Sequence, residues 1–327
     1  MVTLKEIAEA VGVSSATVSR VLNFDATLSV SAKKRQAIIE AAEALNYATP
    51  RNRARAAQQG LSKIALVHFL RPDQELVDPY YVAVRLGIES RCAALKVETV
   101  KVYHTDSMPD ATLLQSASGV IAIGRQTEAE IAWLQRHARH LVFADFLPPS
   151  DELDCVYSDL TMAMRKLLQA LVRMDYRRIA YIGWADARAQ AYVQWMREAG
   201  LYDEQLYRSD NNTEEGGYRA VRQLLSEGRQ LDALVLFNDS MAVGAYRAIH
   251  ELGLDIPGDI GVTSFNDISV AQFMNPPLST VHLPAEEIGE TAVELLLERS
   301  TGRELAKRIT LASRLIWRGS TRHPAGE

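Results

Sequence analysis

The 327-residue sequence lacks the features that mark membrane, secreted and metal-binding proteins. No run approaches about 18 consecutive apolar residues, so we expect no transmembrane helix and no membrane partner. Residues 1–10 carry three charged side chains and no long apolar stretch, so no secretory signal is expected. The two cysteines, Cys92 and Cys155, are too far apart for a metal-ligand pair. We therefore expect a cytoplasmic protein in which both cysteines are small core residues.

Motifs of the common enzyme classes are also missing. The sequence has neither a glycine-rich phosphate loop nor a nucleophile elbow. His137 and His140 do not have the four-residue spacing of a zincin and have no third ligand, so a solvated pair at a helix end is the simpler interpretation. Glu286 and Glu287 are expected to begin a helix, where acids suit the helix dipole. We expect no catalytic residue, no metal site and no cofactor.

Charge is distributed unevenly along the chain. Residues 1–60 contain eight Lys or Arg and five Asp or Glu, which gives them a net charge of +3. Because the whole chain has a net charge of −5, residues 61–327 carry −8. A basic N-terminal module on an acidic body is typical of a DNA-binding head joined to a sensor.

The first 47 residues predict three short helices around a small core. Thr3 and Glu6 have the spacing of a capping box, and Gly12 ends the first helix. Ser14 is a natural N-cap for the second helix, and a third is expected from Ser31 to about residue 47. The inward positions are expected to be Leu4, Ile7, Ala8, Val11, Val18, Val21, Leu22, Ile38, Ile39, Ala42 and Leu45.

The outer face of the second predicted helix suits the major groove of DNA. It begins with small residues, has no acid and carries one long cation, Arg20, which can donate two hydrogen bonds to guanine O6 and N7. Hydroxyls for phosphate oxygens are offered by Ser14, Thr17 and Ser19. Any small three-helix bundle is the alternative, but this face favours a helix-turn-helix.

Residues 48–60 form a basic, alanine-rich linker. Pro50 can start a helix and Gly60 can end it, although a flexible tether is the alternative. Arg53 and Arg55 can hold phosphates in either case.

From residue 63 onward, short apolar strands alternate with amphipathic helices. This alternation predicts parallel sheets covered on both faces, with room for two lobes and ligands at the carboxyl ends of the strands. The expected strands are 64–69, 119–123, 140–144, 178–182, 233–237 and 261–264. The expected helices are 80–95, 126–137, 160–174, 189–199, 215–227 and 240–252.

The sequence resembles the lactose/galactose repressor family over nearly its whole length. In the head, the resemblance rests on residues 2–23, 30–33 and 44–47. In the body, which also resembles periplasmic sugar-binding proteins, it rests on residues 78–81, 237–244, 256–260, 276–281 and 318–321. Residues 78–81 and 266–268 look nearest to members that repress β-galactosidase operons.

The resemblance implies a DNA-binding surface in which Ser15, Ala16 and Arg20 read bases. It also implies that the linker folds into a hinge helix in the minor groove, where Ala57 stands in place of the family's usual leucine wedge. The complete expected set is Thr3, Ser14, Ser15, Ala16, Thr17, Ser19, Arg20, Asn23, Ser31, Arg53, Arg55 and Ala57.

The resemblance further implies an effector site between the lobes. Its carboxylate, amide, guanidinium and aromatic groups suit the hydroxyls and ring face of a sugar. Asn266 departs from the family's usual aspartate, and Asn212 replaces an aromatic residue. The expected effector contacts are Tyr80, Tyr81, Arg125, Asp145, Arg188, Asn212, Asn238 and Asn266.

These observations predict a transcriptional repressor controlled by a sugar or glycoside, or alternatively by a small molecule such as a nucleobase. We expect a homodimer on a pseudo-palindromic operator, with Val82, Val84, Ile88 and Leu95 either forming the dimer or covering the sheet. Residues 319–327 are polar without leucine heptads, which favours a dimer over a tetramer. A periplasmic binding protein or a sugar-modifying enzyme fits less well.

The predicted domains are a helix-turn-helix domain at 1–47, a hinge at 48–60 and an effector-binding and dimerisation region at 61–327. Within that region, lobe 1 is expected at about 61–158 and 283–310, and lobe 2 at about 159–282 and 311–320.

Overall fold

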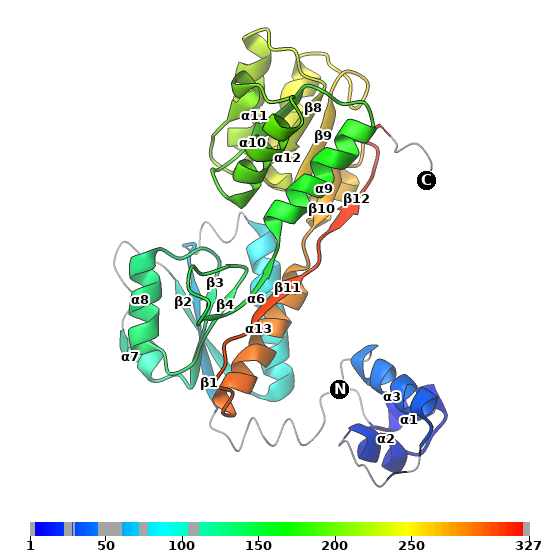
Figure 1. The fold of residues 1–327 in the computed structure, drawn as a ribbon, viewed down its shortest axis with the longest axis vertical. Helices are drawn as coiled ribbons and strands as arrows, with labels where there is room; N and C mark the ends of the chain where they lie inside the picture. Colours follow the sequence, from blue (N-terminus) through cyan, green and yellow to red (C-terminus); the bar gives the residue numbers. More distant parts are fainter. Residues whose placement is uncertain are drawn as a thin grey trace.

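The computed structural model describes residues 4–22, 28, 30–44, 61–71, 78–103 and 111–322. These residues form a three-helix head and an α/β body of two lobes, each built on a six-stranded sheet (Figure 1). The predicted fold class is therefore confirmed. Among the described helices, none is long and apolar enough to span a membrane.

The head consists of α1 (Leu4–Val11), α2 (Ser15–Leu22) and α3 (Ala32–Ala44). Gly12 joins the first two helices with a φ of 66°, a conformation that glycine adopts without steric cost. Ser14 caps α2, because its Oγ accepts a hydrogen bond from the Thr17 amide at 3.1 Å. The buried core is formed by Ile7, Ala8, Val18, Val21, Ile38 and Ala42.

Most of the predicted inward positions of the head are confirmed. Leu4, Val11, Leu22 and Ile39 are partly buried and pack against this core. Thr3, Asn23, Leu45 and the whole hinge, with Arg53, Arg55 and Ala57, lie outside the described residues.

Lobe 1 contains a wholly parallel sheet with the order β11-β5-β4-β3-β1-β2. Helices α6 and α13 cover one face of the sheet, and α7 and α8 cover the other. The strands are β1 (Lys63–His68), β2 (Glu98–Tyr103), β3 (Gly119–Ile123), β4 (Leu141–Ala144), β5 (Asp154–Ser158) and β11 (Arg308–Leu311). The helices are α6 (Pro79–Leu95), α7 (Ala111–Gln115), α8 (Glu128–His137) and α13 (Ala285–Ser300).

Lobe 2 contains the sheet β12-β10-β9-β8-β6-β7, which is parallel except for the antiparallel edge strand β12. Helices α9 and α10 pack on one face, and α11 and α12 pack on the other. The strands are β6 (Ile179–Ile182), β7 (Tyr207–Arg208), β8 (Ala233–Leu236), β9 (Gly261–Asn266), β10 (Ser279–His282) and β12 (Arg314–Ile316). The helices are α9 (Leu160–Arg173), α10 (Ala187–Glu198), α11 (Glu214–Ser226), α12 (Asp239–Glu251) and the 3-10 segments Glu204–Leu206 and Ser269–Phe273.

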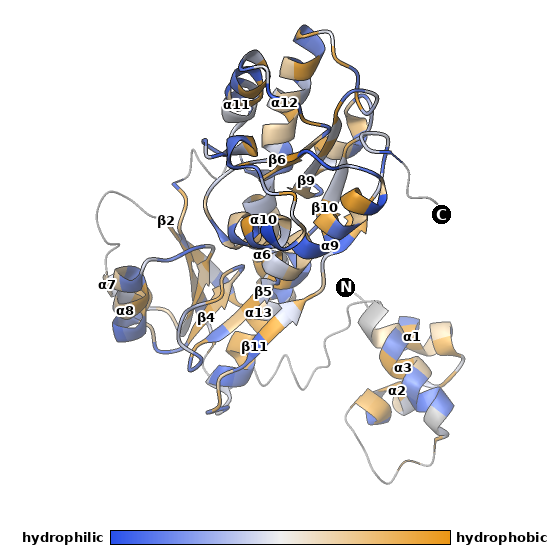
Figure 2. Ribbon diagram, turned by 45° about the horizontal axis from the view of Figure 1, so that its top comes forward, coloured by the Kyte–Doolittle hydropathy of each residue, from blue (hydrophilic) through white to orange (hydrophobic). Residues whose placement is uncertain are grey.

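The chain crosses between the two sheets three times, after β5, after β10 and between β11 and β12. One hydrophobic cluster continues from α6 and α13 of lobe 1 into α9 and α10 of lobe 2. Hydrophobic segments concentrate on the strands and on the helix sides that face them (Figure 2). Both cysteines are buried and free, as predicted.

The six strands and six helices predicted in the body are all present, with small shifts at their ends. Strands β2, β5, β7, β10, β11 and β12 and helix α7 were not predicted. The suggestion that helix 80–95 offers a dimer face is wrong for three of its four residues, since Val84, Ile88 and Leu95 are buried in the core of their own lobe.

Candidate functional site

The predicted effector residues follow the carboxyl ends of strands in both lobes. Tyr80 and Tyr81 lie in the first turn of α6, and Asp145 directly follows β4. Arg188 lies in the first turn of α10, and Asn238 caps α12 two residues after the end of β8. Parallel strands present their carboxyl ends at one edge of each sheet, which is where open α/β folds bind ligands.

Tyr80 and Asp145 form the centre of the lobe 1 part of this site. The Tyr80 hydroxyl donates a hydrogen bond to Asp145 Oδ1 at 2.8 Å, and the Tyr80 and Tyr81 rings meet edge to face with centroids 5.2 Å apart. Asp78 caps α6 by accepting from the Tyr80 amide at 3.2 Å. Asp145 has a left-handed backbone with a φ of 57°, a type of strain that clusters at ligand-binding sites.

Burial makes both carboxyl groups of this cluster easy to protonate. Burial raises the pKa of Asp145 to about 6, although its hydrogen bond from Tyr80 acts in the opposite direction. Burial likewise raises the pKa of Asp78 to about 6, against the opposing hydrogen bond from the Tyr80 amide. The hydroxyl pKa values of Tyr80 and Tyr81 are raised, first by burial and then by the nearby charge of Asp145. Both tyrosines therefore remain neutral donors at neutral pH.

Arg188 of lobe 2 is buried and rigidly held. Its Nε donates to Asp186 Oδ2 at 2.9 Å, and its Nη1 donates to the Phe237 carbonyl at 2.9 Å. Its guanidinium carbon lies 3.5 Å from the centroid of the Phe237 ring and 5.4 Å from that of Phe265. Burial is the largest single effect and opposes its charge, but Asp186, Tyr181 and Tyr81 together outweigh it and raise the Arg188 pKa. The cation is thus permanently charged and preorganised.

The charge of Arg188 reaches across to the lobe 1 cluster. It lowers the pKa of both Asp78 and Asp145, and it also favours ionisation of Tyr80 and Tyr81. The two lobes therefore present a cation and two carboxyl groups within electrostatic range of one another. Such a site can bind a polar, neutral molecule through paired donors and acceptors without a metal ion.

Asn238 and Asn212 of lobe 2 are hydrogen-bonded to each other, whereas Asn266 has no hydrogen bond to either within the described ranges. Asn238 is buried, accepts from the Met241 amide at 2.9 Å and donates to the Asn212 carbonyl at 3.3 Å. The side-chain oxygen of Asn212 is buried with no hydrogen-bond partner among the described residues. Asn266 has a φ of 105°, which makes it a second strained residue at the site.

Asp239 fixes the turn that carries Asn266. Its Oδ2 accepts from the Ile268 amide at 2.7 Å, and its Oδ1 accepts from the hydroxyls of Thr280, at 2.7 Å, and Ser264. Burial raises the pKa of this fully enclosed carboxyl to about 6, against those three hydrogen bonds. Asp239 therefore connects α12, β9 and β10 directly behind the site.

Arg125 is a predicted contact that the structure does not join to this cluster. It follows β3 at the same sheet edge, but it is exposed and has no hydrogen bond or ion pair with the other candidates in the described part of the chain.

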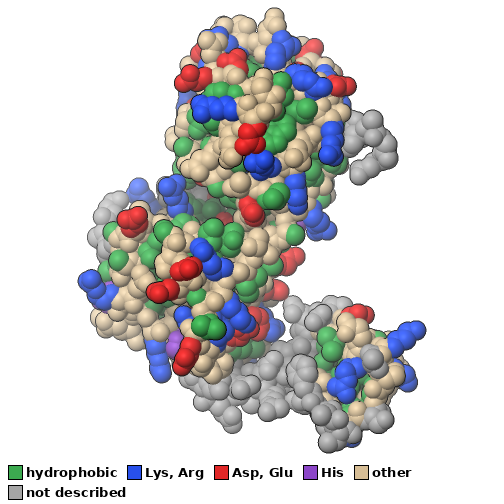
Figure 3. All heavy atoms as spheres, in the orientation of Figure 1, with side chains coloured by type: hydrophobic (Ala, Val, Ile, Leu, Met, Phe, Trp, Pro, Cys, Tyr) green, Lys and Arg blue, Asp and Glu red, His purple; other side chains and the backbone are tan. Residues whose placement is uncertain are grey.

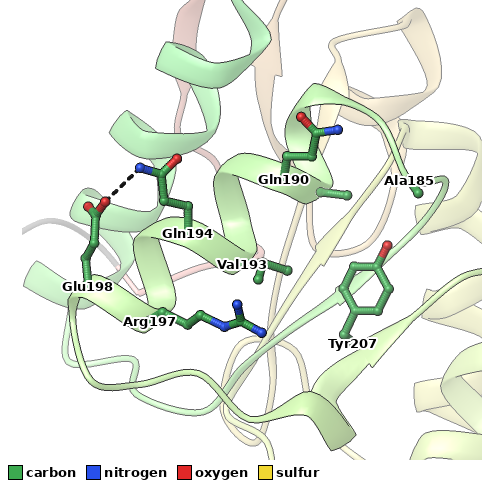
Figure 4. A pocket seen from close by; sticks show the side chains of 8 residues that line it. Ala185, Gln190, Val193, Gln194, Arg197, Glu198 and Tyr207 are labelled. Atoms are coloured by element: carbon green, nitrogen blue, oxygen red, sulfur yellow. Dashed lines mark hydrogen bonds between the residues drawn. The ribbon is translucent and has the colours of Figure 1, made fainter.

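A pocket of about 510 Å³ lies elsewhere, beside α10 and Tyr207 (Figure 4). There the Gln194 side-chain amide donates a hydrogen bond to Glu198 Oε1 at 2.8 Å. The guanidinium carbon of Arg197 lies 4.8 Å from the centroid of the Tyr202 ring. Because none of the predicted effector residues lines this pocket, we treat it as separate from the candidate site.

The surface of α2 has the exposure expected of a groove-binding helix. Ser15, Ala16 and Arg20 are exposed, whereas Thr17 and Ser19 are partly buried. Two of the predicted DNA-binding residues also act as helix caps: Ser14 caps α2, and the Ser31 hydroxyl accepts from the Lys34 amide at 3.3 Å. The face of the head visible in Figure 3 carries Lys and Arg side chains.

Several residues at the site were not predicted from the sequence, namely Asp78, Asp186, Phe237, Asp239 and Phe265. Asp78 and Asp186 each directly precede a helix, the position of an N-cap. Phe237 and Asp239 flank Asn238 at the end of β8, so the rule that ligands bind beyond strand ends was a usable signal for them. Phe265 lies inside β9 and carried no such signal.

Comparison with known proteins places both parts of the chain. Residues 3–50 match the model for bacterial regulatory proteins of the lacI family, and residues 168–321 match a periplasmic binding protein-like domain. The chain is 34% identical to the HTH-type transcriptional repressor MelR of Bacillus subtilis, covering 98% of this chain and 97% of the relative. It is 54% identical to a lactose operon repressor of Rhizobium radiobacter, over 34% of this chain and 98% of that protein.

Solved structures of transcriptional regulators resemble this chain over nearly its whole length. The transcriptional regulator CelR in complex with cellobiose has a TM-score of 0.72 at 26% identity, covering 98% of this chain and all of that one. The lac repressor dimer bound to operator and the anti-inducer ONPF also has a TM-score of 0.72 at 26% identity, with 98% and 99% covered. The chain has the family's head and two-lobed body, and it is 34% identical to a relative over almost its full length. It therefore belongs to the LacI family of bacterial transcriptional regulators.

Proposed function

We propose that this protein represses a carbohydrate-utilisation operon and is controlled by a sugar or glycoside bound between its lobes. The observation that carries the proposal is that polar groups follow the strand ends of both lobes: the Tyr80–Asp145 pair of lobe 1, joined at 2.8 Å, and Arg188 of lobe 2, held by Asp186 and the Phe237 carbonyl. A ligand that bridges these groups binds both lobes at once.

The chemistry of these groups favours a sugar. Carboxylate and guanidinium groups pair with neighbouring hydroxyls, and the partly exposed Tyr81 ring is available for stacking. The partnerless Asn212 oxygen adds an acceptor whose desolvation a hydroxyl donor would offset. The named relatives support this class, since the CelR structure contains cellobiose and one relative is a lactose operon repressor.

Control of DNA binding would follow from the lobe geometry. Three crossover segments connect the lobes, so a ligand held by both changes their relative angle. We infer a homodimer whose heads bind two half-sites of a pseudo-palindrome about one helical turn apart, with Arg20 reading a guanine in each and residues 48–60 in the minor groove. The coupling free energy between effector and operator is expected to be about 1–3 kcal/mol.

A thermal-shift screen followed by gel shift tests the proposal. The panel contains galactosides, glucosides, pentoses and purine nucleobases. A ligand at 100 times its Kd adds about 2.7 kcal/mol to the free energy of unfolding, which shifts the Tm by several degrees. The active sugar should change operator affinity in wild type and have no effect in Arg188→Ala, which should keep its operator affinity. A response to nucleobases alone, or an equal sugar response in Arg188→Ala, contradicts the proposal.

A further inference from the structure

The edge of lobe 1 opposite the effector site contains a second pocket. It has a volume of about 460 Å³ and is formed where two helices end and two central strands begin. Residues 114–118 connect α7 to β3 on one side, and residues 136–139 connect α8 to β4 on the other. The strands' amino ends lie here, so the pocket faces away from lobe 2.

Two arginines give this pocket positive charge. Arg136 and Arg139 are both exposed, and neither has an acidic partner in the ranges that the structure describes. By contrast, Arg85, Arg219 and Arg303 elsewhere in the body are paired with carboxylates at 2.9, 2.5 and 2.8 Å. The charge of the pocket is therefore available to an external anion.

The helix dipole explains only part of this arrangement. Arg136 and His137 lie in the last turn of α8, where cations stabilise the helix end. Arg139 lies beyond the C-cap residue Ala138, which has an extended backbone, so the dipole does not account for it. The turn opposite supplies the hydroxyl-bearing residues Ser116 and Ser118 to the same pocket.

The pocket adjoins the point where the chain enters the body. The Ser62 amide donates to Ser118 Oγ at 3.2 Å, and the Ser118 amide donates to the Lys63 carbonyl at 2.8 Å. Lys63 begins β1, three residues after the end of the linker at residue 60. The pocket therefore lies at the end of lobe 1 where β1 begins.

This edge contrasts with the acidic body as a whole. Glu98 begins the outer strand β2, on the far side of β1. Asp154, at the start of β5, is buried and neutralised by Arg299 and Arg303 at 3.2 and 2.8 Å. Strands β3 and β4, on the other side of β1 from β2, are thus flanked by Arg136 and Arg139, whereas Lys63 is the register partner of the exposed Glu98.

We propose that this pocket is a second DNA contact, in which Arg136 and Arg139 bind backbone phosphates of the operator. The inference rests on the proposed function, because it requires the linker to reach the DNA. The guanidinium groups pair with phosphate oxygens and contribute affinity without reading sequence. The contact offsets the repulsion between an acidic body and a polyanion at the end of the body that approaches the duplex.

The salt dependence of operator binding tests this proposal. Each lost phosphate contact lowers the slope of log K against log [KCl] by about 0.9, so Arg136→Gln/Arg139→Gln should lower it by up to about 1.8 per protomer. The control is Arg173→Gln/Arg314→Gln, which makes the same charge change in α9 and β12 of lobe 2, at two exposed arginines that have no ion pair among the described residues. The control should keep the wild-type slope, and both variants should keep the wild-type Tm, operator preference and effector response.

The outcomes separate this inference from the proposed function. If wild type binds its operator specifically and the pocket variant has the slope of the control, the phosphate contact does not exist and only the inference fails. If 10 mM inorganic phosphate raises the Tm of wild type but not of the pocket variant, while the slopes are equal, the pocket binds a free anion instead. If wild type shows no operator preference at all, the proposed function fails as well.

Discussion

Effector affinity should depend on pH through Asp145. In the proposed complex the ionised carboxylate accepts hydrogen bonds from sugar hydroxyls, so a proton on Asp145 competes with the sugar. Tyr80 occupies only one of the available lone pairs of this carboxylate. A neutral sugar does not titrate in this range, so the protein alone sets the pH dependence.

The size of the effect follows from the raised pKa. With a pKa of about 6, roughly 90% of Asp145 is ionised at pH 7 and roughly 10% at pH 5. The Kd for the effector should therefore increase about tenfold from pH 7 to pH 5 and change little above pH 7. Asp78 has a similar pKa and interacts with Asp145, so the measured midpoint belongs to the pair.

Isothermal titration calorimetry at pH 5, 6, 7 and 8 measures this dependence. Asp145→Asn is the matched control, because the amide keeps the shape of the side chain and does not titrate. Its affinity should be lower at pH 7 and should vary less with pH. A wild-type Kd that is constant, or that decreases at pH 5, would refute an ionised Asp145 as the acceptor.

The same raised pKa affects the unliganded protein. A carboxyl that binds its proton more tightly when folded stabilises the fold below its unfolded pKa of about 4. This contribution is lost as the pH rises from about 4 through about 6.

Three further perturbations test other parts of the molecule. Arg20→Ala should cost about 1–3 kcal/mol of operator binding and relax base preference at one position per half-site, and an unchanged profile in anisotropy titrations of operator variants would exclude this role. Arg188→Lys keeps a cation beside Asp186 but loses the planar fork, so calorimetry should give a 10- to 100-fold weaker effector Kd with unchanged effector-free operator affinity. Gly87→Ala should destabilise the body by about 1–3 kcal/mol in urea unfolding, because its new Cβ would lie 2.2 Å from the Glu286 carbonyl oxygen. The control, Ser90→Ala on the exposed side of the same helix, should be neutral. Equal stability of the two variants would argue against this tight α6–α13 contact.

Local sequence patterns were sufficient to predict an element where the environment of its residues is set by close neighbours in sequence. The head helices follow from apolar residues at helical spacing, with Gly12 and Ser14 marking the turn. The central strands β3 and β8 are continuous apolar runs, because helices cover both faces of each sheet.

Strands with weak local signals were missed. The edge strand β2 mixes apolar with charged and polar residues, of which only Val102 is buried, and β7 has only two residues. The strand β10 is buried yet polar. Ser279 bonds to Ser320 and Thr321, and Thr280 bonds to Asp239, about 40 residues away in each case. No local pattern predicts such burial, because the partners that stabilise it are distant in sequence.

By itself, the sequence determined the kind of protein: a helix-turn-helix head, a linker, two α/β lobes and a set of polar residues after strand ends. Only the tertiary structure decided which of those residues act together. It brings Arg188 within electrostatic range of Asp145, leaves Arg125 exposed apart from them, and places Arg139 beside the entry of the linker. The physical reason is that charge interactions depend on distance and burial, which the packing of the two lobes fixes and residue spacing along the chain does not.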